Sequence, residues 1–303
     1  GDLIEENDRF DRSGWIYADA DIQRVQSLRQ EKSLTAASEW DVLDDTVVIP
    51  VETEDLNFIE ADELERYYDP TPFTPKREED LELILTMQAE SLVQRLQHIG
   101  AKQVFIGVSG GLDSTLAMLV AIRAFDIAGF DKEGIRCITM PSYGTSDRTR
   151  SNAWLLGEKF GLPFQEIELT KALEVHFQDI GLEENDRSVA FENAQARERT
   201  QILMDLSNKE GGIVVGTGDM SEIALGWSTF NGDHMSMYSV NASIPKTLVR
   251  ELVRYEAKKV DDEEIKSLLL DIVDTPVSPE LLPGEDGEIG QKTEEIIGPY
   301  EIH

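Results

Sequence analysis

The segment Ser109–Ser114, with the sequence SGGLDS, combines two adjacent glycines with two hydroxyl groups and one carboxylate. It follows an apolar run and precedes apolar residues at helical spacing, which predicts a turn from a buried strand into a helix. Adjacent glycines let backbone amides approach a ligand, and a helix N-terminus adds a positive dipole. Phosphate or pyrophosphate is the expected ligand, although a turn without a ligand could carry the same glycines. The lysine of a GxxxxGK[ST] loop and a GxGxxG pattern are both missing here.

The elements around this loop alternate between strands and helices. Apolar runs predict strands at 103–109, 135–141, 164–170 and 213–219, and helical patterns predict helices at 81–100, 113–125, 146–161, 171–181 and 191–212. This alternation predicts an α/β fold, a doubly wound parallel sheet with helices on both faces. In such sheets ligands bind beyond the carboxyl ends of the strands, where the loop at Ser109–Ser114 would lie. After Gly232 one more helix is predicted, at 244–259, and 281–303 is predicted to be loop or disorder.

The composition limits the classes of function. The chain has 303 residues, of which 40% are hydrophobic and 29% charged, and its formal net charge is -32. This charge argues against nucleic acid and against an anionic membrane surface as partners, because both attract clustered Lys and Arg. The single cysteine, Cys137, lies in an apolar context and is interpreted as a core residue of a protein from a reducing compartment. No signal peptide or membrane span is visible, so a cytoplasmic location is expected.

Three stretches together resemble a known family. SGGLDS matches the SGGxDS loop of the ATP pyrophosphatases, which form adenylates and release pyrophosphate. The stretch 192–203, ENAQARERTQIL, resembles the EN-x-QAR-x-R helix of NAD synthetases, and 216–247 resembles their longest signature with the GDHM, VNA and PKT pattern of the glutamine-dependent type. The resemblance runs from about Asp80 to the C-terminus and implies an adenine nucleotide alpha-hydrolase-like fold.

The resemblance also implies a domain organisation. Residues 1–65 look like the tail of an upstream glutaminase domain with its linker, and 66–303 look like a synthetase domain that ends before the family's last helices. The glutaminase would need a nucleophilic cysteine of its own, and Cys137 falls inside the synthetase part. Ammonia is therefore expected from solution or from a domain outside this chain. A homo-oligomer is expected as well.

The activity implied by the resemblance is the ATP-dependent amidation of deamido-NAD to NAD. ATP would adenylate the nicotinate carboxylate and release pyrophosphate, and ammonia would then displace AMP, with Mg²⁺ as the cofactor. Two alternatives stay open. One is another AMP-forming ligase, such as a GMP synthetase or a tRNA-thiolating enzyme, and the other is a fragment that binds ATP without turnover.

The resemblance assigns roles residue by residue. ATP contacts fall on Ser109, Gly110, Gly111, Leu112, Asp113, Ser114, Thr217, Lys246 and Ser278; deamido-NAD contacts fall on Asn193, Arg197, Glu222, Trp227, Phe230 and Asp233. Asp113 and Glu222 would hold Mg²⁺ and, with Lys246, act in catalysis. Each of these residues could instead have a structural role. Asp113 could cap a helix, Glu222 could be an acidic residue in the first turn of a helix, and Lys246 could be an ordinary surface lysine. His234 is expected to contact substrate or to be structural, and the four histidines show no zinc spacing.

The acidic composition generates a prediction about rate. Both implied substrates are anions, so a field of charge -32 slows their encounter at low ionic strength. We expect the initial rate at subsaturating substrate to rise with moderate salt, because added ions screen the repulsion. A salt series measures this, and a monotonic fall from the lowest ionic strength would contradict it.

Overall fold

The computed structural model describes residues 6, 10, 15–17, 71–143, 145, 147–183, 186–278 and 293–300. The chain divides into two units, Gly1–Tyr68 and Asp69–His303. In the first unit Trp15 and Tyr17 are exposed. The stretch 41–51, DVLDDTVVIPV, has the apolar residues of a strand, but it lies outside the described residues. The expected domain boundary near residue 65 stays a prediction. Within the described part, no helix combines the length and apolarity that a membrane crossing requires.

The second unit is built on a parallel sheet, as predicted. Its strands are β1 (Val104–Gly107), β2 (Ile135–Thr139), β3 (Phe164–Glu166), β4 (Ile213–Gly216) and β5 (Tyr238–Ser239), in the order β3-β2-β1-β4-β5. Every pairing is parallel. The chain moves outward from β1 in one direction to β3 and in the other to β5. The switch point therefore lies between β1 and β4, which is where ligands bind in such sheets.

Helices connect and cover these strands. They are α2 (Glu78–Ile99), α3 (Leu112–Ala128), α4 (Asp147–Phe160), α5 (Thr170–Ile180), α6 (Val189–Glu210), α7 (Met220–Leu225), α8 (Lys246–Lys259), α9 (Glu263–Asp274) and α10 (Thr293–Ile297), with a 3-10 turn at Lys132–Gly134. The glycine predicted to end the first helix does so: Gly100 has φ 71° and its amide bonds the carbonyls of Leu96 and Gln97. Glycine tolerates this left-handed conformation without the steric penalty that other residues meet.

Two expectations for the C-terminal part are wrong. One helix was predicted after Gly232, but α9 and α10 are present in addition to α8. The side chain of Asp262 caps α9 by accepting from the amides of Glu264 and Ile265, and α9 buries Leu269 and Ile272. The described residues 293–300 are folded rather than disordered, and Tyr300 is only 2% exposed. Residues 281–292 and 301–303 lie outside the described part.

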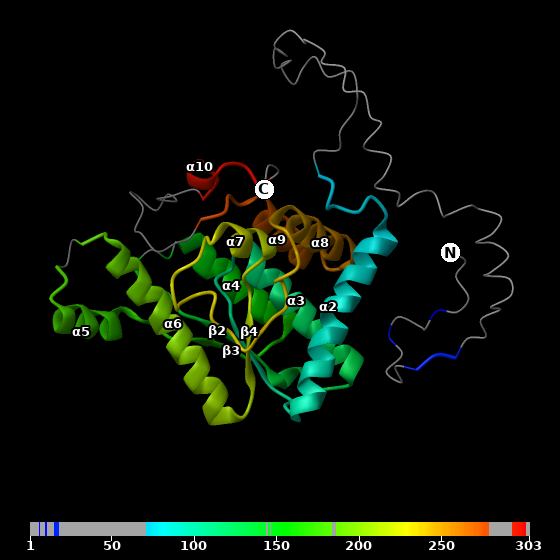
Figure 1. The fold of residues 1–303 in the computed structure, drawn as a ribbon, viewed down its shortest axis with the longest axis horizontal. Helices are drawn as coiled ribbons and strands as arrows, with labels where there is room; N and C mark the ends of the chain where they lie inside the picture. Colours follow the sequence, from blue (N-terminus) through cyan, green and yellow to red (C-terminus); the bar gives the residue numbers. More distant parts are fainter. Residues whose placement is uncertain are drawn as a thin grey trace, which may run out of the picture. The chain divides into compact units, whose positions relative to one another are not determined.

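Alternate side chains of the strands pack into two separate cores. Val104, Ile106 and Cys137 point to the face covered by α3 and α4, with α2, α8 and α9 packed behind. Phe105, Ile138 and Val214 point to the opposite face, against α5 and α6. Figure 1 shows α6 on one side of the strands and α2 and α3 on the other. The continuous apolar runs of the sequence follow from this double burial.

An ion-pair cluster ties together the helices that carry the site. Arg123 of α3 bonds Glu82 of α2 and Glu256 of α8, the latter at 2.6 Å. Glu82 also accepts from Lys259 at 2.8 Å. The hydrogen bond from Arg123 lowers the pKa of Glu82 from 4.5 to about 2 against the opposing effect of burial. Helices α2, α3 and α8 are thereby fixed relative to one another behind the switch point.

A Glu82→Gln substitution tests this cluster. The pKa of Glu82 is lower in the folded chain, so its ionic contribution is present above about pH 4.5 and is lost as the pH falls toward 2. Because Glu82 is partly exposed, we expect a loss of at most about 1 kcal/mol near neutral pH. Urea unfolding at several pH values should show that the gap between wild type and variant closes with acid. A gap that is constant with pH would contradict the ionic explanation.

Candidate active site

A cavity of about 310 Å³ lies at the carboxyl ends of β1, β2 and β4. The loop after β1 contributes Ser109, Gly111, Leu112, Asp113 and Ser114 to its wall. The loop after β4 contributes Thr217 and Gly218, α7 contributes Glu222, and α6 contributes Arg199 and Thr200. The cavity therefore lies at the switch point that the sequence analysis predicted for a ligand.

Hydrogen bonds of its own hydroxyl groups fix the conformation of the loop Ser109–Ser114. Gly110 has φ 85°, a conformation that favours glycine, and turns the chain from β1 into α3. The amide of Gly111 donates to Ser109 Oγ at 3.2 Å, and Ser114 Oγ donates to the carbonyl oxygen of Gly111 at 3.1 Å. Ser109 Oγ and Ser114 Oγ lie 3.2 Å apart. These contacts preform the loop before any ligand arrives.

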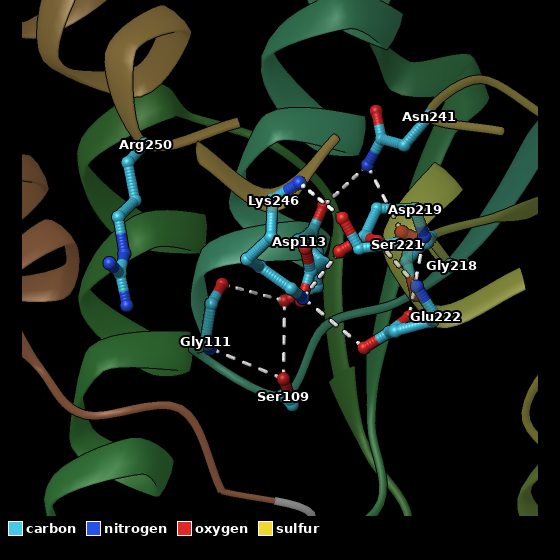
Figure 2. A network of polar contacts seen from close by, with 12 residues as sticks. Ser109, Gly111, Asp113, Gly218, Asp219, Ser221, Glu222, Asn241, Lys246 and Arg250 are labelled. Carbon is cyan, nitrogen blue, oxygen red and sulfur yellow. Dashed lines mark hydrogen bonds and ion pairs between the residues drawn. The ribbon is translucent and has the colours of Figure 1, made fainter. Parts of the chain in front are cut away.

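A buried lysine meets three carboxylates beside this loop. Lys246 Nζ lies 2.6 Å from Asp113 Oδ2, 2.6 Å from Asp219 Oδ2 and 3.2 Å from Glu222 Oε1. The side chains of Lys246 and Asp219 are fully buried. Figure 2 shows the Lys246 side chain running from α8 toward Asp113 and Glu222, which lie in the first turns of α3 and α7. The ring of Tyr300 covers the ammonium group at 5.5 Å from its centroid.

Burial and the neighbouring charges set the protonation of this cluster. Burial raises the pKa of Asp113, although Lys246 opposes that shift. Burial, followed by the charge of Asp113, raises the pKa of Glu222 to about 7. Burial tends to lower the pKa of Lys246, but the three carboxylates outweigh it and hold that pKa well above the ordinary value. The lysine is therefore a cation, and the carboxyl groups of Asp113 and Glu222 hold a proton more readily than exposed carboxyl groups do.

Asp219 is a site residue that sequence reasoning missed. It is the N-cap of α7, where its Oδ1 accepts from the Glu222 amide at 2.9 Å while Glu222 Oε2 accepts from the Asp219 amide at 3.3 Å. This reciprocal capping box fixes both side chains. Its sequence signal, an Asp followed three residues later by a Glu, is present in 219–222, DMSE. The other carboxylate oxygen of Asp219, Oδ2, contacts Lys246. The capping pattern in the sequence does not indicate this second contact.

The carboxylate cluster has the donor set of a cation site. One oxygen each of Asp113, Asp219 and Glu222 lie within 4.8 Å of one another. Asp113 Oδ1 is buried and has no hydrogen-bond partner in the described part of the chain. Carboxylate oxygens are the ligands that Mg²⁺ prefers, and a buried unpaired oxygen is costly unless a ligand completes it. The residues present therefore fit a divalent cation.

The structure brings some of the predicted residues to the cavity and leaves others apart. Those lining it are Ser109, Gly111, Leu112, Asp113, Ser114, Thr217, Glu222, Trp227, Asp233 and Ser278, and His234 as well. Gly110 and Lys246 are not among the lining residues, although Lys246 contacts Asp113 and Glu222, which are. Asn193, Arg197 and Phe230 are not among the described lining residues: Phe230 is 72% exposed, and its carbonyl accepts from Arg197 Nε at 3.1 Å.

Arg199, two residues after Arg197, is the arginine of α6 that reaches the cavity wall. Its Nε donates to the Met140 carbonyl at 3.2 Å, and its guanidinium donates to Ser142 Oγ at 2.7 Å. Arg199 thus ties the loop after β2 to α6. The sequence does not show which of Arg197 and Arg199 faces the cavity. The two residues lie on different faces of α6, and the rotation of the helix decides which face is turned to the sheet.

The sequence and the fold have counterparts among known proteins. A protein-family model described as NAD synthase matches residues 84–267. A glutamine-dependent NAD(+) synthetase of Mycobacterium leprae (strain TN) is 41% identical over 250 residues, which cover 79% of this chain and 36% of the relative. The chain thus spans about a third of the length of such curated relatives.

Two solved structures are similar as well. One is a glutamine-dependent NAD+ synthetase from Acinetobacter baumannii in complex with ADP, with a TM-score of 0.57 and 27% identity over 63% of this chain and 35% of that one. The other is an NH3-dependent NAD synthetase from Campylobacter jejuni subsp. jejuni NCTC 11168, with a TM-score of 0.53 and 25% identity over 63% and 84% of the two chains. The parallel sheet and its covering helices match this type of fold.

Removing the charge of Lys246 should destabilise the chain and make it depend on added cations. We expect Lys246→Met to lose about 3–5 kcal/mol of unfolding free energy in EDTA, because three buried carboxylates lose their counter-charge. Mg²⁺ should raise the thermal midpoint of this variant more than that of the wild type. Lys258→Met is the control, since Lys258 lies on the same helix and is 61% exposed in its pair with Glu78. A Lys246→Met chain as stable as the wild type in EDTA would contradict the compensation of charge.

Proposed function

Since the chain belongs to the NAD synthase family, we propose that its cavity binds ATP and catalyses the ATP-dependent amidation of deamido-NAD. The observation that carries the proposal is the carboxylate cluster of Asp113, Asp219 and Glu222 in direct continuation of the SGGLDS loop. Backbone amides and hydroxyls on one side and carboxylates on the other suit the polyphosphate of a nucleotide with a cation between them. The similar structure from Acinetobacter baumannii is a complex with ADP, which supports an adenine nucleotide as the kind of ligand proposed here.

The loop Ser109–Ser114 would hold the phosphates. The amides at the start of α3 and the hydroxyls of Ser109 and Ser114 can donate to phosphate oxygens, where negative charge grows as pyrophosphate leaves. Thr217 and Ser278 are proposed as further ATP contacts, and both line the cavity. Lys246 would reach a phosphate only by leaving at least one of the carboxylates that now surround it.

Asp113 and Glu222 are proposed to hold Mg²⁺, with Asp219 close by. When bound, this ion would neutralise the phosphates and stabilise the charge that develops during adenylation. Asp113 would supply the buried oxygen that has no other partner. Glu222, with a pKa of about 7, would supply its oxygen once it loses its proton.

Deamido-NAD is proposed to bind next to ATP. Its nicotinate carboxylate attacks the α-phosphorus of ATP, forming an acyl adenylate as the bond to pyrophosphate breaks. Ammonia then attacks the acyl carbon, AMP leaves, and the nitrogen releases a proton. Trp227 and Asp233 lie at the cavity wall, where they can contact this substrate. Asn193, Arg197 and Phe230 lie outside the wall, so any contact with deamido-NAD would involve a part of the substrate that extends beyond the cavity.

The source of ammonia is proposed to be solution or another domain. Cys137 is fully buried in β2, and burial raises the pKa of its thiol to about 12. A protonated, inaccessible thiol cannot be the nucleophile of a glutaminase. This bears out its interpretation as a core residue.

A homo-oligomer is proposed on the family resemblance.

Pyrophosphate release tests the proposed function. Release by the chain should require ATP, Mg²⁺ and deamido-NAD, and with ammonium ions it should yield NAD. Asp113→Asn removes one carboxylate without changing the size of the side chain, and we expect at least about a hundredfold loss of rate, which corresponds to about 2.7 kcal/mol. Asp126→Asn is the matched control, because Asp126 lies on the same helix α3 and is 58% exposed.

Each other outcome would assign a different function. Pyrophosphate release that does not depend on deamido-NAD would favour another AMP-forming ligase. Binding of ATP without any release would leave a nucleotide-binding chain without turnover. Equal rates of pyrophosphate release for Asp113→Asn and wild type would show that the Asp113 carboxylate has no role in catalysis.

A further inference from the structure

A buried asparagine joins the two loops that carry the carboxylates. Asn241 is fully buried just after β5, within the VNA stretch at 240–242 for which the proposed reaction has no role. Its Nδ2 donates to the backbone carbonyl of Asp113 at 3.0 Å and to that of Thr217 at 3.1 Å. Asp113 follows β1 and Thr217 follows β4. One amide group thereby spans the switch point, as Figure 2 shows by the lines from Asn241.

The orientation of this amide is determined by its partners. Both N–H groups of Asn241 face carbonyl oxygens, so the opposite orientation would place Oδ1 against two acceptors. On the other side, Asn241 Oδ1 accepts from Gln88 Nε2 at 3.2 Å, and the same nitrogen donates to the Val240 carbonyl at 2.8 Å. Gln88 belongs to α2, which packs behind α3. The amide of Asn241 is therefore clamped between the helix layer and the two loops.

Further bonds join the Asn241 segment to the loop of Asp219 and Glu222. The amide of Lys246 donates to Ser221 Oγ at 3.1 Å, and the amide of Met220 donates to the Ile244 carbonyl at 2.9 Å. These two bonds link the segment to one loop only. Asn241 bonds the backbone of both segments, whereas Lys246 joins Asp113 to the capping box of Asp219 and Glu222 through their side chains.

We infer that Asn241 is a positioning residue that holds Asp113 and Glu222 at the separation at which they share one cation with bound ATP. This inference rests on the proposed function. Asn241 does not touch the carboxylates themselves: it acts on the backbone of the loops that carry them. A group of this kind tunes a metal site through its ligands, and its loss typically weakens metal affinity by about 10–100-fold.

The test compares two affinities for each variant, measured by calorimetry on the full 303-residue chain. One titration uses ATP with excess Mg²⁺ and the other uses ATP in EDTA, and their ratio isolates the contribution of the metal. We expect Asn241→Ser, whose side chain is too short to bridge the two carbonyls, to lower this ratio at least about tenfold while the affinity for ATP in EDTA stays the same. Ser207→Ala is the matched control: Ser207 is also fully buried and hydrogen-bonded, but it bonds the Met204 carbonyl on α6, away from the cavity.

A second variant covers the case in which Asn241→Ser does not fold. Gln88→Met removes the donor to Asn241 Oδ1 and keeps both loop bonds, so we expect a smaller, severalfold fall of the same ratio. An unchanged ratio in Asn241→Ser, even with a lower thermal midpoint, overturns the inference, because it would show a structural role alone. If Asn241→Ser is unfolded, an unchanged ratio in Gln88→Met overturns it.

The two affinities of the wild-type chain show whether a negative result concerns Asn241 alone or the proposed function as a whole. A wild-type chain that binds ATP equally well in Mg²⁺ and in EDTA would overturn the proposed metal site and the inference with it. A wild-type chain that prefers ATP with Mg²⁺, together with variants that share the same preference, would overturn the role of Asn241 alone.

Discussion

The compensation of three buried carboxylates by one buried ammonium group is the constraint on which the site depends. Lys246 lies within 3.2 Å of Asp113, Asp219 and Glu222, each on a backbone segment that must be held in place for the contact to exist. An unpaired charge at any of these positions would be strongly unfavourable away from water. The turn after β1, the capping box of α7 and the start of α8 are therefore coupled through a single nitrogen atom.

The topology explains why these segments meet. β1 and β4 are neighbours in the sheet, but the helices that follow them lead in different directions, and this leaves room at their carboxyl ends. Gly110 turns the chain into α3 with a positive φ, so Asp113 lies in the first turn of that helix. The ion pairs of Arg123 hold α2, α3 and α8 together behind the loops. The outer helices thus act on the site by orienting α3 and α8, and Gln88 of α2 also bonds Asn241 directly.

Local patterns in the sequence predict the layers of the fold well and its polar contacts poorly. The apolar runs around Ile106 and Val214 indicate strands because double burial requires apolar side chains on both faces, and Gly100 indicates a helix end because few other residues adopt its φ. The two-residue strand β5 is too short to show a period. Asp219 carries a cap signal, but its second partner, Lys246, is 27 residues away and is set by tertiary packing. Arg197 and Arg199 differ only by the rotation of α6, which the pattern of that polar helix does not fix.

The charge of the cluster itself supports the divalent cation that we propose for this cavity. Three ionised carboxylates and one ammonium group sum to a charge of about minus two, which is the charge that a Mg²⁺ ion would balance. Burial, followed by the charge of Asp113, raises the pKa of Glu222 to about 7, so this carboxyl group resists adding a third negative charge to the cluster. The proton and the metal therefore compete for the same carboxylate. A cation held by Glu222 would require the ionised carboxylate, so we expect the cation affinity of the proposed site to rise with pH.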